Sequence, residues 1–242
     1  MINPKSAKTY VSADVRLQLS LTRSPAVTTL PPSSDVAFTA AVKAVQERRG
    51  SRHAYRRLEE KGGWRTTVTP ELAEFIAARD SVYFATANAR GQPYIQHRGG
   101  PRGFIRVLDA KTLGFADYSG NRQYITTGNL SENRHAFLFL TDYAQRRRIK
   151  IWGHARVVDD DPALIERLMP RDYAAAPEQA ILFTIEAWDV NCPQHIPQKF
   201  DAAEIEAVAA PLFTRIATLE AEVKRLSALL GISAQTATGG NP

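Results

Sequence analysis

The clearest alternation of apolar and polar side chains runs through residues 148–158, which read RIKIWGHARVV. A period of two is typical of a strand that turns one face to a core and the other to water or a ligand. The apolar face would carry Ile149, Ile151, Ala155 and Val157, and the other face Arg148, Lys150, Trp152, His154 and Arg156. The stretch therefore predicts a half-buried β-strand.

Further strand-like runs surround this stretch, and only two brief helices interrupt them, from about Arg122 to Asn129 and from Pro162 to Leu168. A parallel doubly wound sheet would need a helix after each strand, and the phosphate-binding loops GxGxxG and GxxxxGKS/T are absent. The pattern predicts a mainly β fold, a six-stranded antiparallel barrel over residues 80–198, because closing a sheet removes its aggregation-prone edges. Together with residues 148–158 the strand-like runs number seven, one more than the six strands expected for the barrel, and the other six are Val82 to Ala87, Tyr94 to Arg98, Gly103 to Leu108, Leu113 to Tyr118, Phe137 to Thr141 and Ile181 to Trp188.

A helical segment is expected before the barrel, over residues 36–79. Its first helix has Asp35 as a possible N-cap and Gly50 as its end. Its last helix starts with Thr69 as N-cap and Pro70 in the first turn, a position that proline favours.

The two ends of the chain differ in character. Residues 1–35 show no sustained periodicity and predict an extended or disordered arm, and residues 232–242 predict a disordered tail. Residues 199–231 instead predict an amphipathic helix with Pro211 in its first turn. Its apolar stripe needs a partner, either the barrel or the same helix of a second subunit in a coiled coil, and we expect the second. The stripe consists of Ile216, Leu219, Val223, Leu226 and Leu230.

Composition excludes several classes of protein. The chain has 242 residues, of which 44% are hydrophobic and 23% charged, as in ordinary globular proteins. The one cysteine, Cys192, excludes an intramolecular disulfide framework and favours a reducing compartment. No apolar stretch reaches the roughly 20 residues of a membrane helix. We therefore expect a cytoplasmic protein that does not enter a membrane.

The net charge of +6 raises the question of nucleic acid as a partner. A solvated helix face explains the main arginine cluster, which lacks the interleaved aromatic side chains of a base-stacking platform, so nucleic-acid binding is not expected. The cluster consists of Arg48, Arg49, Arg52, Arg56 and Arg57. The histidines show neither i, i+4 pairing nor a close carboxylate cluster, so no metal site is expected. They are His53, His97, His135, His154 and His195.

Two segments carry residues suited to a phosphate. Residues 92–108 combine glycines, which allow close backbone approach, with Arg98, Arg102 and Arg106, whose forked donors suit phosphate. In residues 117–123 a predicted strand ends in a Ser-Gly-Asn turn that opens a helix, and a helix N-terminus favours an anion. A phosphate held between the two segments is physically reasonable.

Taken with residues 75–80, 148–153 and 191–196, the two segments resemble the flavin-binding split barrels related to pyridoxamine 5'-phosphate oxidase, most closely their predicted flavin-nucleotide-binding subgroup. The resemblance covers roughly residues 38–198. It implies flavin mononucleotide (FMN) at the interface of a homodimer. The phosphate would be held by Arg98 and Arg122, with Ser119 and Asn121 assisting. The whole set implied as FMN-binding is His97, Arg98, Gly99, Gly100, Arg106, Tyr118, Ser119, Asn121, Arg122, Gln123, Lys150 and Trp152.

The resemblance further implies that Lys150 and Trp152 of the other subunit lie beside the isoalloxazine ring, although interface packing is an equal alternative for Trp152. The chain departs from the family pattern at Asn133-Arg134, where Asn-Pro is frequent, so this segment should be less rigid. It also has residues 191–195 in place of the oxidase's basic C-terminal segment, so vitamin B6 oxidation is not implied.

The function stays open between two classes at this stage. We favour a flavin-dependent oxidoreductase that acts on an unidentified small molecule, and the alternative is a non-catalytic flavin carrier or sensor. The sequence discriminates poorly between them, because the cofactor itself performs flavin chemistry. His195 is the one candidate for a catalytic proton donor, since histidine titrates near neutral pH, and hydrogen-bonded structure is its alternative role.

Overall fold

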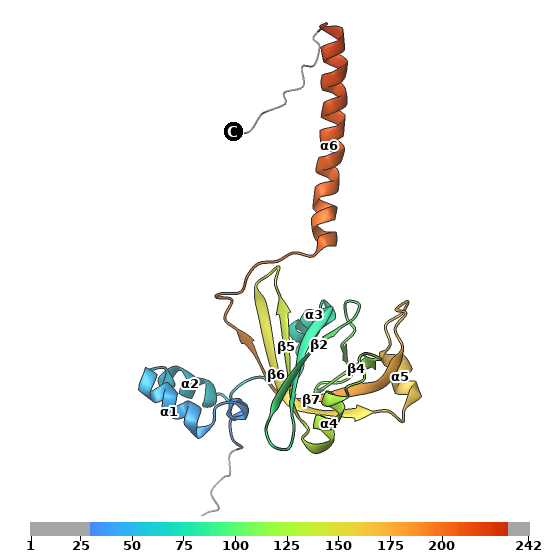
Figure 1. The fold of residues 1–242 in the computed structure, drawn as a ribbon. Coiled ribbons are helices and arrows are strands. Elements are labelled where there is room, and N and C mark those ends of the chain that lie inside the picture. The colour runs from blue at the N-terminus through green and yellow to red at the C-terminus, as the bar shows by residue number, and fades with distance from the viewer. Residues whose placement is uncertain (1–29, 232–242) are drawn as a thin grey trace, which may run out of the picture. The chain divides into compact units, whose positions relative to one another are not determined.

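The computed structural model describes residues 30–231, so most of the predicted arm and the predicted tail lie outside the described residues. The helices and strands belong to one unit that begins at Pro32 (Figure 1). In chain order they are η1 (Ser33–Val36), α1 (Ala40–Arg49), α2 (Arg52–Glu59), α3 (Pro70–Ala77), β1 (Ser81–Ala87), β2 (Pro93–Gly99), β3 (Arg106–Val107), β4 (Thr112–Tyr118), α4 (Ile125–Glu132), β5 (His135–Asp142), β6 (Arg147–Val158), α5 (Pro162–Leu168), β7 (Pro177–Asn191) and α6 (Ala202–Leu229).

One antiparallel sheet contains all seven of these strands, in the order β2-β1-β5-β6-β7-β4-β3. The predicted mainly β, antiparallel fold is confirmed, and the count of six strands is wrong by one. The short strand β3 replaces the predicted strand Gly103 to Leu108. Its shortness has a local cause, because Gly103 has a φ of 78° and the N–H of Phe104 donates to the Pro101 carbonyl, which forms a turn.

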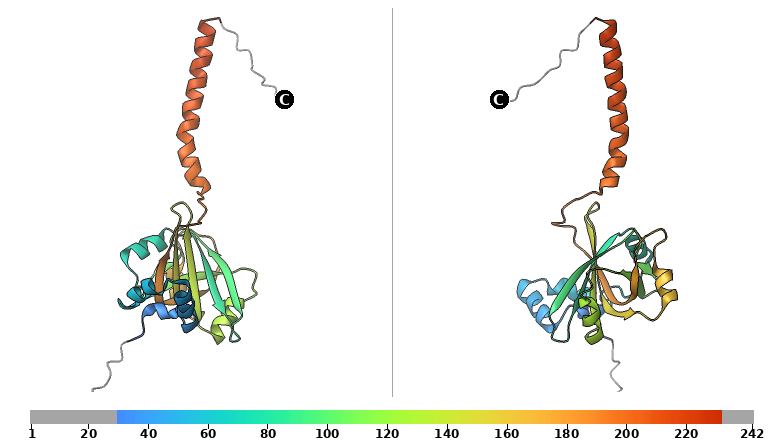
Figure 2. Two further views of the ribbon diagram at one scale, coloured as in Figure 1. Left: turned by 90° about the vertical axis from the view of Figure 1, so that its left-hand side faces the viewer. Right: turned by 45° about the vertical axis from the view of Figure 1, so that its right-hand side comes forward.

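The sheet curls until strands far apart in its order face each other, as Figures 1 and 2 show. Inside the curl, the rings of Phe84 on β1 and Phe115 on β4 lie 6.0 Å apart, edge to face. Arg98 of β2 forms an ion pair with Asp117 of β4, although four strands separate β2 from β4 in the sheet. The two edge strands, β2 and β3, do not pair with each other in the described part of the chain. The sheet is therefore a barrel with a split between its edges.

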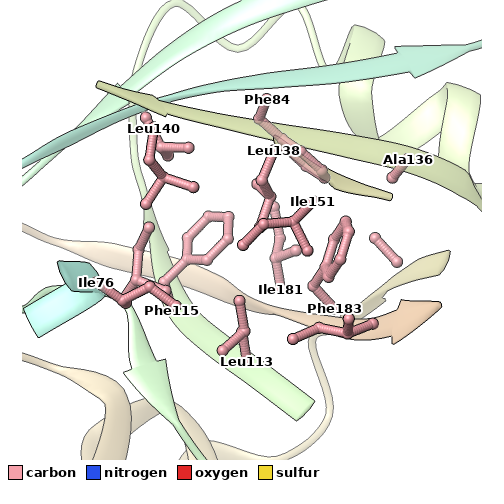
Figure 3. Packing of buried hydrophobic residues seen from close by; sticks show 14 of the residues in the cluster. Ile76, Phe84, Leu113, Phe115, Ala136, Leu138, Leu140, Ile151, Ile181 and Phe183 are labelled. Atoms are coloured by element: carbon pink, nitrogen blue, oxygen red, sulfur yellow. The ribbon is translucent and has the colours of Figure 1, made fainter. Parts of the chain in front are cut away.

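The core lies inside this curl (Figure 3). Ile149 and Ile151 of β6 are fully buried, whereas Lys150 and Trp152 are only half-buried, which confirms the alternation predicted from the sequence. Burial of each large apolar side chain contributes about 1.5–3 kcal/mol. The largest fully buried side chains are Phe84, Phe104, Phe115, Phe183, Leu72, Ile76, Leu113, Leu138, Leu140, Ile149, Ile151 and Leu168.

A β-bulge interrupts the pairing of β6 with β7. The register shifts beside Gly153 and leaves Glu186 as the extra residue of β7. Glycine is required at position 153 for a steric reason, because a Cβ there would collide with the carbonyl oxygen of Thr184 and lie 2.8 Å from the ring of Phe183. The close approach of the two strands at the bulge therefore depends on glycine.

The first predicted helix starts later than expected. Thr39, not Asp35, is the N-cap of α1, and its Oγ1 accepts a hydrogen bond from the N–H of Val42. Asp35 belongs to η1 and accepts a hydrogen bond from Lys43 Nζ at 2.7 Å. The last residues of the predicted arm are therefore part of a short helix.

Other helix boundaries agree with the sequence signals. Gly50 ends α1 with a φ of 76°, Thr69 caps α3, and Pro70 is the first residue of that helix. The prediction that the arginine cluster of residues 48–57 is a solvated helix face is wrong for Arg52. This side chain is buried and pairs with Glu59.

The helix α4 starts at Ile125, three residues after the predicted start. Arg122 and Tyr124 have φ values of 59° and 53°, which lie in the left-handed region and cannot continue a helix. The polar residues 119–122 therefore form a loop before α4 and not its first turn.

The helix α6 starts well before Pro211. Asp201 and Glu204 form a capping box that begins the helix at Ala202, so Pro211 lies inside it and not in its first turn. None of its residues is buried, and the predicted apolar stripe is exposed along its length. Among the residues that the structure describes, no helix has the length and apolar character needed to cross a bilayer.

Candidate functional site

A pocket of about 200 Å³ lies between β2 and the segment that joins β4 to α4. Its lining includes residues from both segments that the sequence predicted to hold a phosphate. The predicted residues that line it are Arg98, Tyr118, Asn121, Arg122 and Gln123. The fold therefore brings together two segments that are separate in the sequence.

Arg98 reaches the pocket from the inner face of β2. The register pairs it with the buried Val82 of β1, so both side chains lie on the same face of the sheet. Arg98 Nη1 lies 2.5 Å from Asp117 Oδ1, and Nη2 donates to Asp117 Oδ2 at 3.3 Å. The Nε of Arg98 is buried, and this donor has no acceptor among the described residues.

Asp117 is the counter-ion of Arg98, and the sequence analysis did not select it. Gln179 Nε2 donates to Asp117 Oδ2 at 2.8 Å and to Thr127 Oγ1 at 3.0 Å, which links β4, β7 and α4. Burial raises the pKa of Asp117, although the nearby Arg98 guanidinium acts in the opposite direction. The carboxyl group therefore takes up a proton more readily than an exposed aspartate does.

Polar contacts around Glu178 hold the loop before α4. Ser119 Oγ donates to Glu178 Oε1 at 2.9 Å, and Tyr124 Oη donates to the same oxygen at 3.4 Å. Arg122 Nε donates to Tyr124 Oη at 3.1 Å. The Arg122 side chain is 72% exposed, and Nε makes its only hydrogen bond within the described residues. Its two Nη groups therefore face a ligand or water.

The first residues of α4, Ile125, Thr126 and Thr127, also line the pocket, so the N-terminus of this helix belongs to the candidate site. The free N–H groups of α4 begin at Ile125, beyond the loop. The N–H of Gln123 is already bonded to Asn121 Oδ1 at 3.2 Å. An anion in the pocket would therefore meet the N-terminal end of α4 as well as the side chains of Arg98 and Arg122.

The other predicted residues lie outside the lining of this pocket. Gly100 serves close packing, because a Cβ there would lie 2.9 Å from the Cβ of Phe104. His195 follows β7, is exposed and has a φ of 62°, and it does not line the pocket. The predicted FMN-binding residues that do not line it are His97, Gly99, Gly100, Arg106, Ser119, Lys150 and Trp152.

Lys150 and Trp152 lie on the outer face of β6, where they contact Trp64. The rings of Trp64 and Trp152 stack with centroids 4.6 Å apart and 13° between their planes. Lys150 Nζ lies 5.5 Å from the ring of Trp64 and 3.1 Å from Asp189 Oδ2. Sequence reasoning missed Trp64, because it reaches Trp152 only through the tertiary fold.

A family model described as pyridoxamine 5'-phosphate oxidase matches residues 68–192, just over half of the 242 residues. The chain belongs to this family. The match begins just before α3 and ends just after β7, so the oxidase-family region contains all seven strands of the barrel. No curated protein matches the chain significantly.

The solved structures that are similar to this oxidase-family chain have low sequence identity to it. HupZ of Group A Streptococcus is 18% identical, with a TM-score of 0.43, and the match covers 55% of this chain and 99% of that one. A Clostridium acetobutylicum protein related to general stress protein 26 is 18% identical, with a TM-score of 0.39 and coverages of 56% and 94%. An FMN-binding protein of Syntrophomonas wolfei is 14% identical, with a TM-score of 0.39 and coverages of 63% and 98%.

One sequence signal would have identified the missed Asp117. Leu113 and Phe115 of β4 are buried, so the period of two places Asp117 on the same inward face. A charged residue at an inward position of a strand needs a partner, because burial of an unpaired charge is costly. The candidate site therefore includes Asp117 and its hydrogen-bond donor Gln179.

Proposed function

We propose that the chain binds FMN with its phosphate in the pocket between β2 and the loop before α4. The observation that carries this proposal is the meeting of two arginines in one pocket, Arg98 with a buried Nε that lacks a partner and Arg122 with exposed Nη groups. Guanidinium groups of this kind form strong, charge-assisted hydrogen bonds to phosphate oxygens.

The side chains around the pocket present a net positive charge to an anion only if one carboxyl group is protonated. Arg98 and Arg122 face Asp117 and Glu178, so the four groups are balanced when all are ionised. Burial has already raised the pKa of Asp117. Uptake of a proton by Asp117 would leave the positive charge of Arg98 for the phosphate.

The size of the pocket supports a site that needs a second subunit. A volume of about 200 Å³ suits a phosphate and its neighbouring atoms, whereas pockets that enclose a whole drug-sized ligand occupy roughly 300–1,000 Å³. We therefore propose that the flavin ring lies outside this pocket, at the interface of a homodimer. Lys150 and Trp152 of the other subunit remain the proposed ring contacts.

The favoured activity is that of a flavin-dependent oxidoreductase acting on a small molecule. A bound flavin supplies hydride or electron transfer, and the protein supplies binding and orientation. Arg98 and Arg122 would hold the phosphate end, and Asp117 would hold Arg98 in place. The single cysteine supports a reducing compartment, and we propose the cytoplasm.

The test compares FMN with riboflavin, which lacks the phosphate. Arg122→Ala should weaken FMN binding about 10- to 100-fold, since a hydrogen bond to a charged group contributes about 1.5–3 kcal/mol, and should leave riboflavin binding unchanged. Arg90→Ala in the exposed β1–β2 turn is the charge-matched control. Flavin fluorescence on titration with protein measures both affinities. Equal affinities of Arg122→Ala and the unchanged chain for FMN would contradict the phosphate site.

A second function is favoured by the position of His195. This candidate proton donor does not line the pocket, which agrees with a flavin carrier or sensor without turnover. Anaerobic mixing of the flavin-loaded protein with NADH or NADPH separates the two functions. Bleaching of the flavin absorbance by either donor, as hydride passes from the nicotinamide to the flavin, supports the oxidoreductase, and unchanged absorbance with both donors supports the carrier.

A further inference from the structure

Two histidines and a glutamate meet on the outer face of the sheet, away from the residues that line the proposed phosphate pocket. His135 lies on β5, His154 on β6 and Glu186 on β7. The two imidazole rings have centroids 4.5 Å apart, and His154 Nδ1 lies 3.4 Å from Glu186 Oε1. One ligand atom of each residue lies within 4.8 Å of those of the other two.

The sequence showed no close carboxylate beside the histidines, but the tertiary fold places Glu186 next to His154, so that expectation is wrong. His135 and His154 are partners in the antiparallel register of β5 and β6, so their side chains lie side by side on one face. Sequence spacing could not show this pair, because a turn and parts of two strands separate the residues.

The β-bulge brings in the third residue. Glu186 is the extra residue of β7, and bulges of this kind redirect a side chain and are frequent beside functional sites. Gly153, which precedes His154, lets the backbone of β7 approach closely, because any Cβ there would collide with the Thr184 carbonyl. The position of Glu186 beside the histidine pair is thus built into the backbone of two strands.

The donor set is that of a transition-metal site. Two imidazole nitrogens and one carboxylate oxygen are the protein ligands of many zinc sites that keep a position open for water or substrate. Ligands about 2.1 Å from a tetrahedral zinc ion lie roughly 3.4 Å apart, so ligand atoms that are up to 4.8 Å apart need to converge by at most about 1.4 Å. His135 and His154 are not buried, and rotation of their side chains can supply this movement.

We propose that His135, His154 and Glu186 bind one divalent transition-metal ion of the zinc type. A cavity of about 300 Å³ adjoins two of the three residues, His135 and Glu186, and its lining also includes Phe137, Thr86 and Trp152. It leaves room for water or a small anionic ligand at the fourth coordination position. None of the three residues lines the phosphate pocket, although Trp152, a proposed contact of the flavin ring, lines the adjoining cavity, so Zn²⁺ binding is measured without added flavin.

The test uses the full chain as purified, freed of any affinity tag and dialysed against a chelator and then against buffer. Equilibrium dialysis with Zn²⁺, followed by elemental analysis, should give one ion per chain. His154→Ala and Glu186→Gln should each weaken Zn²⁺ binding at least about 100-fold. Each change removes a direct ligand, which costs more affinity than loss of a residue that only orients a ligand, about 10- to 100-fold. His53→Ala, which removes an exposed histidine of α2, is the matched control and should bind Zn²⁺ as the unchanged chain does.

A second measurement guards against misfolded variants. Circular dichroism and thermal unfolding establish that each variant is folded, and Zn²⁺ should raise the midpoint of the unchanged chain and of His53→Ala but not of His154→Ala. Co²⁺ in place of Zn²⁺ should give visible absorption bands that depend on the same residues. The proposal is overturned if the folded chain retains no Zn²⁺, or if His154→Ala and Glu186→Gln bind it as tightly as the unchanged chain. That result would leave a simple His154–Glu186 ion pair.

Discussion

Replacement of Arg98 tests how the candidate site is held together. Arg98 and Asp117 are largely buried, with side chains 18% and 8% exposed. The Arg98→Ala change removes the guanidinium and leaves the Asp117 carboxylate without its ion-pair partner. Removal of one partner of a buried pair costs about 3–5 kcal/mol. Coulomb attraction at an effective dielectric constant of 20 and a charge separation of about 4 Å gives about 4 kcal/mol, which agrees.

The cost should be largest at a pH where the Asp117 carboxyl group is ionised and should shrink as the pH falls and that group takes up a proton. Burial holds the folded-state pKa of Asp117 above its ordinary value of 3.8, and loss of Arg98 removes a group that lowers it. A raised folded-state pKa contributes stability that is complete below the unfolded pKa and is lost as pH rises through the folded pKa. Arg98→Ala should therefore be most unstable at neutral pH and should recover part of its stability toward pH 4–5.

Urea unfolding followed by tryptophan fluorescence, without added flavin, measures the free energy of unfolding between pH 5 and pH 8. The double variant Arg98→Ala/Asp117→Asn should be more stable at pH 8 than Arg98→Ala alone, because no buried charge remains unpaired. Arg90→Ala should stay within about 0.5 kcal/mol of the unchanged chain. The reasoning is refuted if the cost of Arg98→Ala is the same at pH 5 and pH 8 and simply adds to that of Asp117→Asn.

Two further predictions concern the bulge and the C-terminal helix. Gly153→Ala should lower the free energy of unfolding by at least about 3 kcal/mol, because its Cβ would meet backbone. Gly120→Ala is the control, because a Cβ at that position meets open space and should leave the stability unchanged. Equal melting temperatures of the two variants would contradict the steric argument. A chain that ends at Gln198 lacks the exposed apolar stripe of α6 and should therefore self-associate more weakly. Light scattering at low protein concentration measures this association. A dimer that persists without α6 would place the interface in the barrel.

The strands were predictable because their side chains alternate. A half-buried strand must place apolar residues at every second position, and this local rule holds for Ile149 and Ile151 in β6. Glycine and proline gave equally local signals, as Gly50 and Pro70 show at the ends of α1 and α3. The start of α4 was not predictable from such signals, because the left-handed conformations of Arg122 and Tyr124 are unusual for these residue types.

The candidate site was predictable only in part. The arginines and glycines of residues 92–108 and the turn before α4 indicated an anion site, and the family resemblance implied Arg98 and Arg122 as the phosphate ligands. It did not indicate Asp117 as the partner of Arg98, since the two strands meet only when the sheet curls. The contact of Trp64 with Trp152 and the meeting of His135 with Glu186 were not predictable either, because each joins residues that are far apart in the chain and come together only in the tertiary fold.

By itself, the sequence determined the antiparallel β class, the boundaries of most strands and the two segments suited to phosphate. These follow from side-chain periodicity and backbone preferences, which act over a few residues. Only the tertiary structure decided which side chains face each other across the barrel, because strand register, the bulge at Glu186 and the curl of the sheet set distances between residues far apart in the chain. The charge balance around Arg98 and the histidine–glutamate cluster are properties of that arrangement.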